Sequence, residues 1–199
     1  MLFLYVNDIL LIHMAKFINL NNQLKSEIDA ILIKYSLIEL LASYGKVQVT
    51  GSYSYDLMAW RDYDLVIELN DYTTEAVYKL VDDIGVKLNP DRLRILNNLN
   101  KTETNRPQGV WLGVYIENWK IDIWLMNSEN FKKEVQNSQK LKEKLKDVDR
   151  ETLISIKSEL SKDPDYHVKF SSVDLYEAYL DGNVRTVQEF YEKLKNLKI

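Results

Sequence analysis

Residues 46–69 read KVQVTGSYSYDLMAWRDYDLVIEL, and this stretch decides the fold. Residues 46–50 alternate between polar and apolar side chains, and residues 63–69 are mostly apolar, so each run predicts a β-strand. Gly51 and Ser52 follow the first strand directly. The missing side chain of Gly51 lets backbone N–H groups approach an anion, and the Ser52 hydroxyl can donate a hydrogen bond as well. The first strand is therefore expected to end at a place that can hold an anionic group.

Two aspartates mark the start of the second strand. Asp62 and Asp64 are two positions apart, and side chains alternate along a strand. Both carboxylates therefore share one face, while Tyr63 and Leu65 point into the core. Like charges this close repel each other, and burying them unpaired is unfavourable. A divalent cation is the simplest way to neutralise them.

A third acid has a similar setting. Asp122 interrupts the otherwise apolar run WKIDIWLM at residues 119–126, although aspartate is depleted in strands. If this strand lies beside the strand of Asp62 and Asp64, three carboxylates converge and could hold one or two ions, which in two-metal sites lie about 3.5–4 Å apart. The chain has no cysteine and two histidines, so oxygen ligands and a hard ion such as Mg²⁺ or Mn²⁺ are expected.

The spacing of these residues resembles the signature of the DNA polymerase β-like nucleotidyltransferase superfamily. That signature is a Gly-Ser or Gly-Gly pair, a short spacer, an Asp-hydrophobic-Asp/Glu-hydrophobic motif and a third acid on a later strand. Here nine residues separate Ser52 from Asp62. The likeness covers residues 46–126. More narrowly, GSY, WRDYDL, WLGVY and WKIDIW, together with residues 171–178 and 184–187, resemble uncharacterised bacterial nucleotidyltransferase-like proteins.

The resemblance implies an α+β fold, with a nucleotidyltransferase-like mixed β-sheet flanked by helices and a helical C-terminal extension. It also implies catalytic and metal-binding roles by matched position. Asp62 and Asp64 would bind both metal ions, and Asp122 would bind the catalytic ion and help to deprotonate the acceptor. Gly51 and Ser52 would contact the nucleoside triphosphate.

The chain departs from the family pattern at two places. Tyr55 stands near the position of a second glycine in many members, and Arg61 replaces a serine just before the first aspartate. Arg61 could contact phosphate or pair with Asp56 to hold the loop. Lys120 could neutralise phosphate or act as a strand-edge lysine that blocks aggregation. Three tryptophans could stack on a base or, as the stronger expectation, pack in the core: Trp111, Trp119 and Trp124.

The rest of the chain predicts mostly regular structure. Residues 110–116 and 119–126 are expected to be strands around a turn at Glu117 and Asn118, and residues 99–109 a loop. Pro90 is expected to open a short helical piece. Apolar spacing predicts helices over residues 21–44, 74–84, 129–145, 150–160, 173–180 and 186–197. The first of these ranges is either one helix or two abutting helices, and it ends at Gly45. We expect an α/β core over residues 1–127 and a helical region packed on it over residues 128–199.

Charge and the N-terminal sequence restrict partners and location. With 26 basic and 30 acidic residues, the net charge of −4 argues against binding of long nucleic acid. Residues 1–14 lack the basic flank of an export signal and are too short and polar to span a bilayer. They suggest a buried strand or packed arm, with Met14 as an alternative natural start. A cytoplasmic location without membrane contact is expected.

These observations lead to one functional hypothesis and two rivals. The hypothesis is a nucleotidyltransferase that uses Mg²⁺ or Mn²⁺ to move a nucleoside monophosphate from a nucleoside triphosphate, ATP first, to a small-molecule or protein acceptor. The first rival is a non-catalytic nucleotide-binding sensor or antitoxin-like module on the same fold. The second is a metal nuclease, whose acid and lysine spacing Glu117 and Lys120 do not supply convincingly. The acceptor, the preferred base and the oligomeric state are left open.

Overall fold

The computed structural model describes residues 15–97, 108–182 and 184–197. The expectations for residues 1–14, and for most of the loop over residues 99–109, concern segments outside this range. The chain forms two compact units, each described by itself. Of the described residues, one unit contains those within 25–55 and 61–142, and the other those within 15–24, 56–60 and 143–197. The boundary expected at residue 127 stays a prediction.

Five strands within the described residues form one mixed sheet in the first unit, in the order β1-β2-β5-β4-β3. The strands are β1 Gly45–Val49, β2 Asp62–Leu69, β3 Arg92–Asn97, β4 Val110–Ile116 and β5 Trp119–Met126. β2 and β5 pair in parallel, and every other neighbouring pair is antiparallel. The predicted α+β class is confirmed. β5 lies in the middle of the sheet, hydrogen-bonded on both sides.

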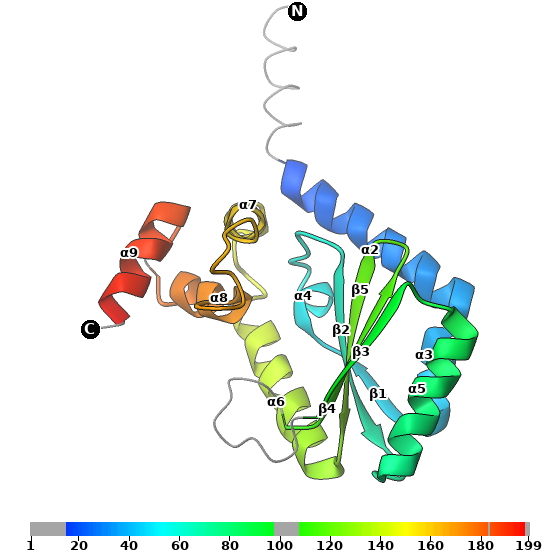
Figure 1. Ribbon diagram of the computed structural model, residues 1–199. Coiled ribbons are helices and arrows are strands. Elements are labelled where there is room, and N and C mark those ends of the chain that lie inside the picture. The colour runs from blue at the N-terminus through cyan, green and yellow to red at the C-terminus, as the bar shows by residue number, and fades with distance from the viewer. Residues whose placement is uncertain (1–14, 98–107, 183, 198–199) are drawn as a thin grey trace, which may run out of the picture. The chain divides into compact units, whose positions relative to one another are not determined.

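One face of the sheet forms the main core of this unit. α3 (Leu37–Tyr44) contacts β1 and α5 (Thr74–Leu88). A Cβ on Gly85 of α5 would lie 3.6 Å from the Leu93 side chain, which places α5 on this face of β3. Figure 1 shows α3 and α5 on this side of the sheet. The buried side chains here include Tyr63, Leu65, Ile67, Leu80, Ile84, Leu112, Val114, Ile121 and Ile123.

The opposite face is apolar at one end and acidic at the other. α6 (Ser128–Lys144) places Phe131 against Val66 of β2 and Met126 of β5, and all three side chains are buried. Asp64 lies on the same face of β2 as Val66 because the two residues are two positions apart. The helix thus covers the carboxyl end of β2, while the aspartates lie at the end where β2 and β5 begin.

The hairpin between β4 and β5 turns at the two residues expected from sequence. Glu117 and Asn118 have φ values of 49° and 65°, as a two-residue type I′ turn requires. The tip is also tied to α2 (Lys16–Tyr35), because Glu117 Oε1 accepts hydrogen bonds from Lys34 Nζ at 2.5 Å and from the Tyr35 hydroxyl at 2.7 Å. The tip of this hairpin is therefore held in place on one side.

The prediction of a helical piece after Pro90 is wrong. α5 ends at Leu88, and the next residue, Asn89, is left-handed with φ 44° and donates its backbone N–H to the Gly85 carbonyl. Arg92–Asn97 is instead the edge strand β3, paired with β4 from Arg92 opposite Tyr115 to Asn97 opposite Val110. Pairing with β4 satisfies the backbone groups on one side of this segment, and that partner is distant in sequence.

The other predicted helices are present with small shifts at their ends. The segment over residues 21–44 is two abutting helices, α2 and α3, separated at Ser36 with φ 45°. The second unit contains α7 (Arg150–Leu160), α8 (Ser172–Leu180) and α9 (Val187–Leu197). In residues 15–97, 108–182 and 184–197 we find no helix that combines the length and apolar character of a membrane-spanning segment. The cytoplasmic location stays a prediction.

A buried lysine takes part in the core of the second unit. Lys157 of α7 is 2% exposed, and its ammonium donates a hydrogen bond of 2.9 Å to the Leu57 carbonyl. The ammonium also lies 4.4 Å from the Trp60 ring centroid. This contact attaches residues 56–60 to the C-terminal helices of the same unit.

We expect Lys157→Ala to lower the free energy of unfolding by about 2–4 kcal/mol, because it leaves a cavity and an unsatisfied carbonyl. Urea denaturation would measure the change. Lys162→Ala, which removes an exposed lysine just after the same helix, should change stability by less than about 0.5 kcal/mol. Equal losses in the two variants would contradict the role given to Lys157.

Candidate metal and nucleotide site

The strand register brings the three sequence-predicted acids together. In the parallel pairing of β2 with β5, Asp64 lies opposite Asp122, and Asp62 lies opposite Lys120. Asp62, Asp64 and Asp122 each offer a carboxylate oxygen, and these oxygens all lie within 4.8 Å of one another. The expected convergence is therefore observed, while metal binding by these residues stays a prediction.

Gly51 lies directly against one of these acids. Its φ is +61°, and a Cβ built on it would stand 2.1 Å from Asp64 Oδ2, too close for any side chain. The Thr50 N–H donates to the Asp64 carbonyl at 3.0 Å, which fixes the chain beside β2. β1 ends at Val49, one residue before the expected end of the strand, and Gly51 and Ser52 begin the one-turn helix α4 (Gly51–Ser54). The Gly-Ser pair thus adjoins the acids, as its spacing suggested.

Lys120 is a component of the acidic cluster. Its Nζ lies 2.5 Å from Asp122 Oδ2 and 3.3 Å from Asp62 Oδ1. The strand-edge interpretation of this lysine is wrong, because β5 is paired on both sides. A single ammonium group therefore bridges two of the three carboxylates.

Burial and charge set the protonation of the cluster. Burial, and then the charge of Asp62, raise the pKa of Asp122 to about 6, although Lys120 acts in the opposite direction. For Lys120, burial alone would lower the pKa, but Asp62 and Asp122 together raise it above its usual value. At neutral pH the lysine is charged and Asp122 is mostly ionised.

The donor set fits a hard divalent cation. Asp122 Oδ1 is a buried oxygen that accepts no well-aligned hydrogen bond in the described part of the chain, although the Trp111 side chain lies near this carboxylate and acts to lower its pKa. An unsatisfied buried acceptor is unfavourable, and a cation would satisfy it. Carboxylate oxygens are the ligands that Mg²⁺ and Mn²⁺ prefer. Asp62, Asp64 and Asp122 could hold such an ion, and the missing side chain of Gly51 leaves room for the Asp64 carboxylate.

Two other predicted residues have partners that differ from those proposed. Arg61 Nε donates to Glu27 Oε2 at 2.8 Å, so its pairing with Asp56 is wrong. Asp56 lies 3.6 Å from Arg150 in an ion pair of the other unit. Glu27 lies 34 residues before Arg61, and the local sequence gave no signal for this pair.

The tryptophans divide between core and site face. Trp119 is 2% exposed and packs in the core, as expected. Trp111 and Trp124 are half-buried and lie opposite each other on the acidic face of β4 and β5. A Cβ on Gly113 would approach the Trp111 ring to 2.7 Å, so this glycine, opposite Asp122, makes room for the indole.

Sequence reasoning missed part of this face. Arg92 and Arg94 of β3 lie over the Tyr115 ring, with guanidinium carbons 4.0 and 5.7 Å from its centroid. The alternation of arginine with Leu93 and Ile95 is a strand pattern that could have located them. Because a helical piece was expected after Pro90, this strand pattern was not recognised.

Comparisons with known proteins show the fold. No protein-family model and no curated protein matches the chain. Among solved structures, it is similar to a cytoplasmic RNA terminal U-transferase, with a TM-score of 0.50 and 13% identity over 82% of this chain and 49% of that one. The RNA terminal uridylyl transferase Cid1 gives 0.47 and 14%, over 83% and 50%. The CdnE c-UMP-AMP synthase of Rhodothermus marinus gives 0.42 and 12%, over 81% and 74%.

The first of these likenesses supports a nucleotidyltransferase-like fold for this chain. At 13% identity it carries the fold alone. The chain also spans only about half the length of the first two structures.

We expect Gly51→Ala to weaken binding of Mn²⁺, because the added methyl group would displace the Asp64 carboxylate. Mn²⁺ affinity, measured by calorimetry or electron paramagnetic resonance, tests this. Gly182→Ala is the matched control: Gly182 also has a positive φ, of 97°, but a Cβ there meets nothing within 4 Å. Both variants should lose about 1–3 kcal/mol of stability from backbone strain. If both bind Mn²⁺ as the wild type does, the steric argument is wrong.

We also expect Mn²⁺ affinity to rise with pH between about 5 and 7. Asp122, with a pKa of about 6, must lose its proton before it can bind a cation, so protons compete with the metal below that value. In Asp122→Asn the affinity should be lower and the rise flatter. A wild-type affinity that stays constant across this range would contradict the assignment of Asp122 as a ligand.

Proposed function

We propose that this chain is a metal-dependent nucleotidyltransferase that moves a nucleoside monophosphate from a nucleoside triphosphate, ATP first, to an acceptor hydroxyl or phosphate. The observation that carries the proposal is the placement of Asp62, Asp64 and Asp122 within 4.8 Å on one face of the sheet, with Gly51 against Asp64. The sequence spacing and the nucleotidyltransferase-like fold support the same conclusion. A small molecule and a protein hydroxyl are both proposed acceptor classes.

Each residue has a proposed role. Asp62 and Asp64 hold both ions and Asp122 holds the catalytic one. Mg²⁺ or Mn²⁺, when bound, would neutralise phosphate charge and orient the acceptor oxygen. Gly51 and Ser52 contact the polyphosphate, because Gly51 lies against Asp64 without a side chain of its own. The position of Gly51 beside Asp64 supports a triphosphate bound next to the acids.

The proposed reaction balances as a single displacement. The acceptor oxygen forms a bond to the α-phosphorus, the bond from that phosphorus to the β-phosphate oxygen breaks, and pyrophosphate leaves. The acceptor proton passes to the Asp122 carboxylate and then to solvent.

The test is incubation of the protein with ATP labelled at the α-phosphate, Mg²⁺ or Mn²⁺, and cell extract. We expect label on an acceptor and release of pyrophosphate, both falling to background in Asp64→Ala, because that variant removes a metal ligand. Glu68→Gln is the matched control: it lies on the same face of β2, outside the cluster, and should retain activity. Label transfer by Asp64→Ala at the wild-type rate would refute the assigned roles.

One observation favours a second candidate function, a non-catalytic nucleotide sensor. Lys120 already pairs with both Asp62 and Asp122 without a metal ion. A protein of this kind would bind ATP without releasing pyrophosphate in any extract. Equilibrium dialysis with ATP, measured beside the transfer assay, distinguishes the two functions.

A further inference from the structure

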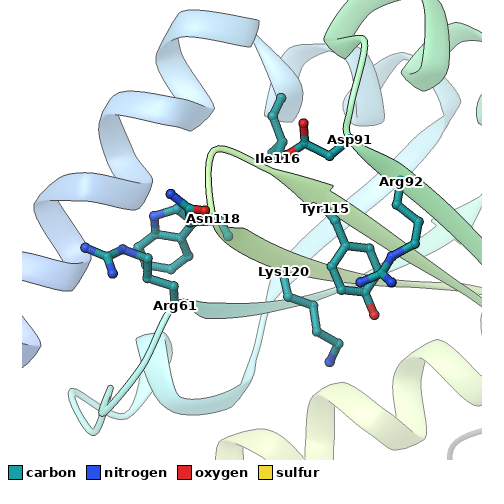
Figure 2. Close-up of a pocket in the computed structure, with 8 residues that line it drawn as sticks. Arg61, Asp91, Arg92, Tyr115, Ile116, Asn118 and Lys120 are labelled. Atoms are coloured by element: carbon teal, nitrogen blue, oxygen red, sulfur yellow. The ribbon is translucent and has the colours of Figure 1, made fainter.

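A cavity of about 500 Å³ lies on the first unit, where β2 and β5 begin. Its lining includes three basic side chains, Arg61, Arg92 and Lys120, and a single acidic one, Asp91 (Figure 2). The net charge of the whole chain is −4, so this concentration of positive charge is local. Lys120 belongs both to the cavity wall and to the carboxylate cluster. The cavity therefore adjoins the candidate site through Lys120.

One row of side chains joins the cavity to the acids. Across the sheet, Asp62 lies opposite Lys120, Lys120 opposite Tyr115, and Tyr115 opposite Arg92. Residues opposite each other in a sheet project from the same face. Arg92, Tyr115 and Lys120 thus form a basic and aromatic wall beside Asp62.

Within the described residues, Arg92 is the cation of the cavity lining whose guanidinium pairs with no carboxylate. Arg61 pairs with Glu27, and Lys120 pairs with Asp62 and Asp122. Arg92 is exposed, and within the described residues its guanidinium contacts the Tyr115 ring but no carboxylate. A guanidinium stacked on an aromatic ring keeps its N–H groups available at its edge, in the fork that matches phosphate or carboxylate oxygens.

The spacing of the strands limits the size of the ligand. Neighbouring strands lie about 4.8 Å apart. The Arg92 guanidinium lies over Tyr115 of β4, and β4 is the neighbour of β5, which carries Asp122. An anion bound there is roughly one or two strand spacings, about 5–10 Å, from the carboxylates. One sugar ring, or a hydroxylated chain of similar length, covers this distance.

We propose that this cavity binds the acceptor, and that the acceptor is a hydroxylated anion. Its phosphate or carboxylate pairs with Arg92, and its reactive hydroxyl lies about one sugar length away, at the aspartates. The assignment of this ligand as an acceptor rests on the proposed function. The binding of an anion by Arg92 does not.

Lys120 links this cavity to the metal site. A divalent ion between the aspartates competes with its ammonium for Asp62 Oδ1 and Asp122 Oδ2. A displaced Lys120 still lines the cavity, where it adds a second free cation beside Arg92. Metal and anionic acceptor therefore favour each other's binding, and such coupling is reciprocal.

The test is calorimetric binding of ribose 5-phosphate, ribonate and ribose to the whole chain at constant ionic strength. Binding is measured with and without Mn²⁺, and with α,β-methylene-ATP present to occupy the triphosphate site. We expect at least one of the two anions to bind and neutral ribose not to bind. Binding of ribose 5-phosphate alone identifies a phosphate ligand, and binding of ribonate alone identifies a carboxylate. Equal binding of ribose and both anions, or no binding of either anion, would overturn the proposal.

Variants assign the binding to the wall. Arg92→Gln should weaken anion binding about 10- to 100-fold, the loss typical of a charged hydrogen-bonding partner. Lys79→Gln is the matched control. Lys79 is an exposed cation of α5, at the opposite face of the sheet, and its ammonium lies 5.5 Å from the Tyr44 ring centroid. Mn²⁺ should strengthen anion binding in the wild type, and Lys120→Gln should lose this gain. Wild-type binding by Arg92→Gln would refute the site.

Failure of the inference can be told from failure of the proposed function. If ATP transfers label but Arg92→Gln leaves the KM for the acceptor unchanged, the acceptor site lies elsewhere and the transferase remains. If the anion binds through Arg92 but no label is transferred, the cavity is an anion site and the transferase assignment fails.

Discussion

The parallel pairing of β2 with β5 is the constraint on which the rest of the site depends. It sets Asp64 opposite Asp122 and thereby gathers three negative charges on one face of a sheet whose other face is the core. Such a gathering is unfavourable without compensation. The neighbouring features are arranged around this charge. An ammonium group bridges two acids, a residue without a side chain adjoins the third, and Phe131 of α6 covers the apolar end of the face.

Lys120 gives the cluster a stable state without metal. A buried carboxylate with no cation would be protonated or would destabilise the fold, and the lysine limits both effects. The same contact means that an incoming ion must compete for oxygens that already have a partner. The lysine thus stabilises the fold and also sets a threshold for occupation of the site. Its two-residue spacing from Asp122 makes both possible, because the two side chains project from the same face of β5.

Local patterns were sufficient for those parts of the site that lie close together in sequence. Alternation placed Asp62 and Asp64 on one face with Tyr63 in the core, and the gap between two apolar runs located the turn at Glu117 and Asn118. Features that depend on distant partners were not accessible. β3 is a strand because β4 lies beside it, Lys120 is central because β5 is paired on both sides, and Arg61 finds Glu27 on a helix that precedes the motif. Pro90, after α5, predicted a helix, but pairing with β4 makes residues 92–97 a strand instead.

The attachment of the β4–β5 hairpin to α2 has a consequence for recognition. Glu117 receives two hydrogen bonds from that helix, and the next residue, Asn118, lines the cavity. A rim fixed in this way loses little conformational entropy when a guest arrives, so more of the interaction energy remains as affinity. It also accommodates an oversized guest poorly, because widening the opening would break the bonds to α2. For the proposed acceptor, this fixed rim would discriminate by shape before any charge is recognised.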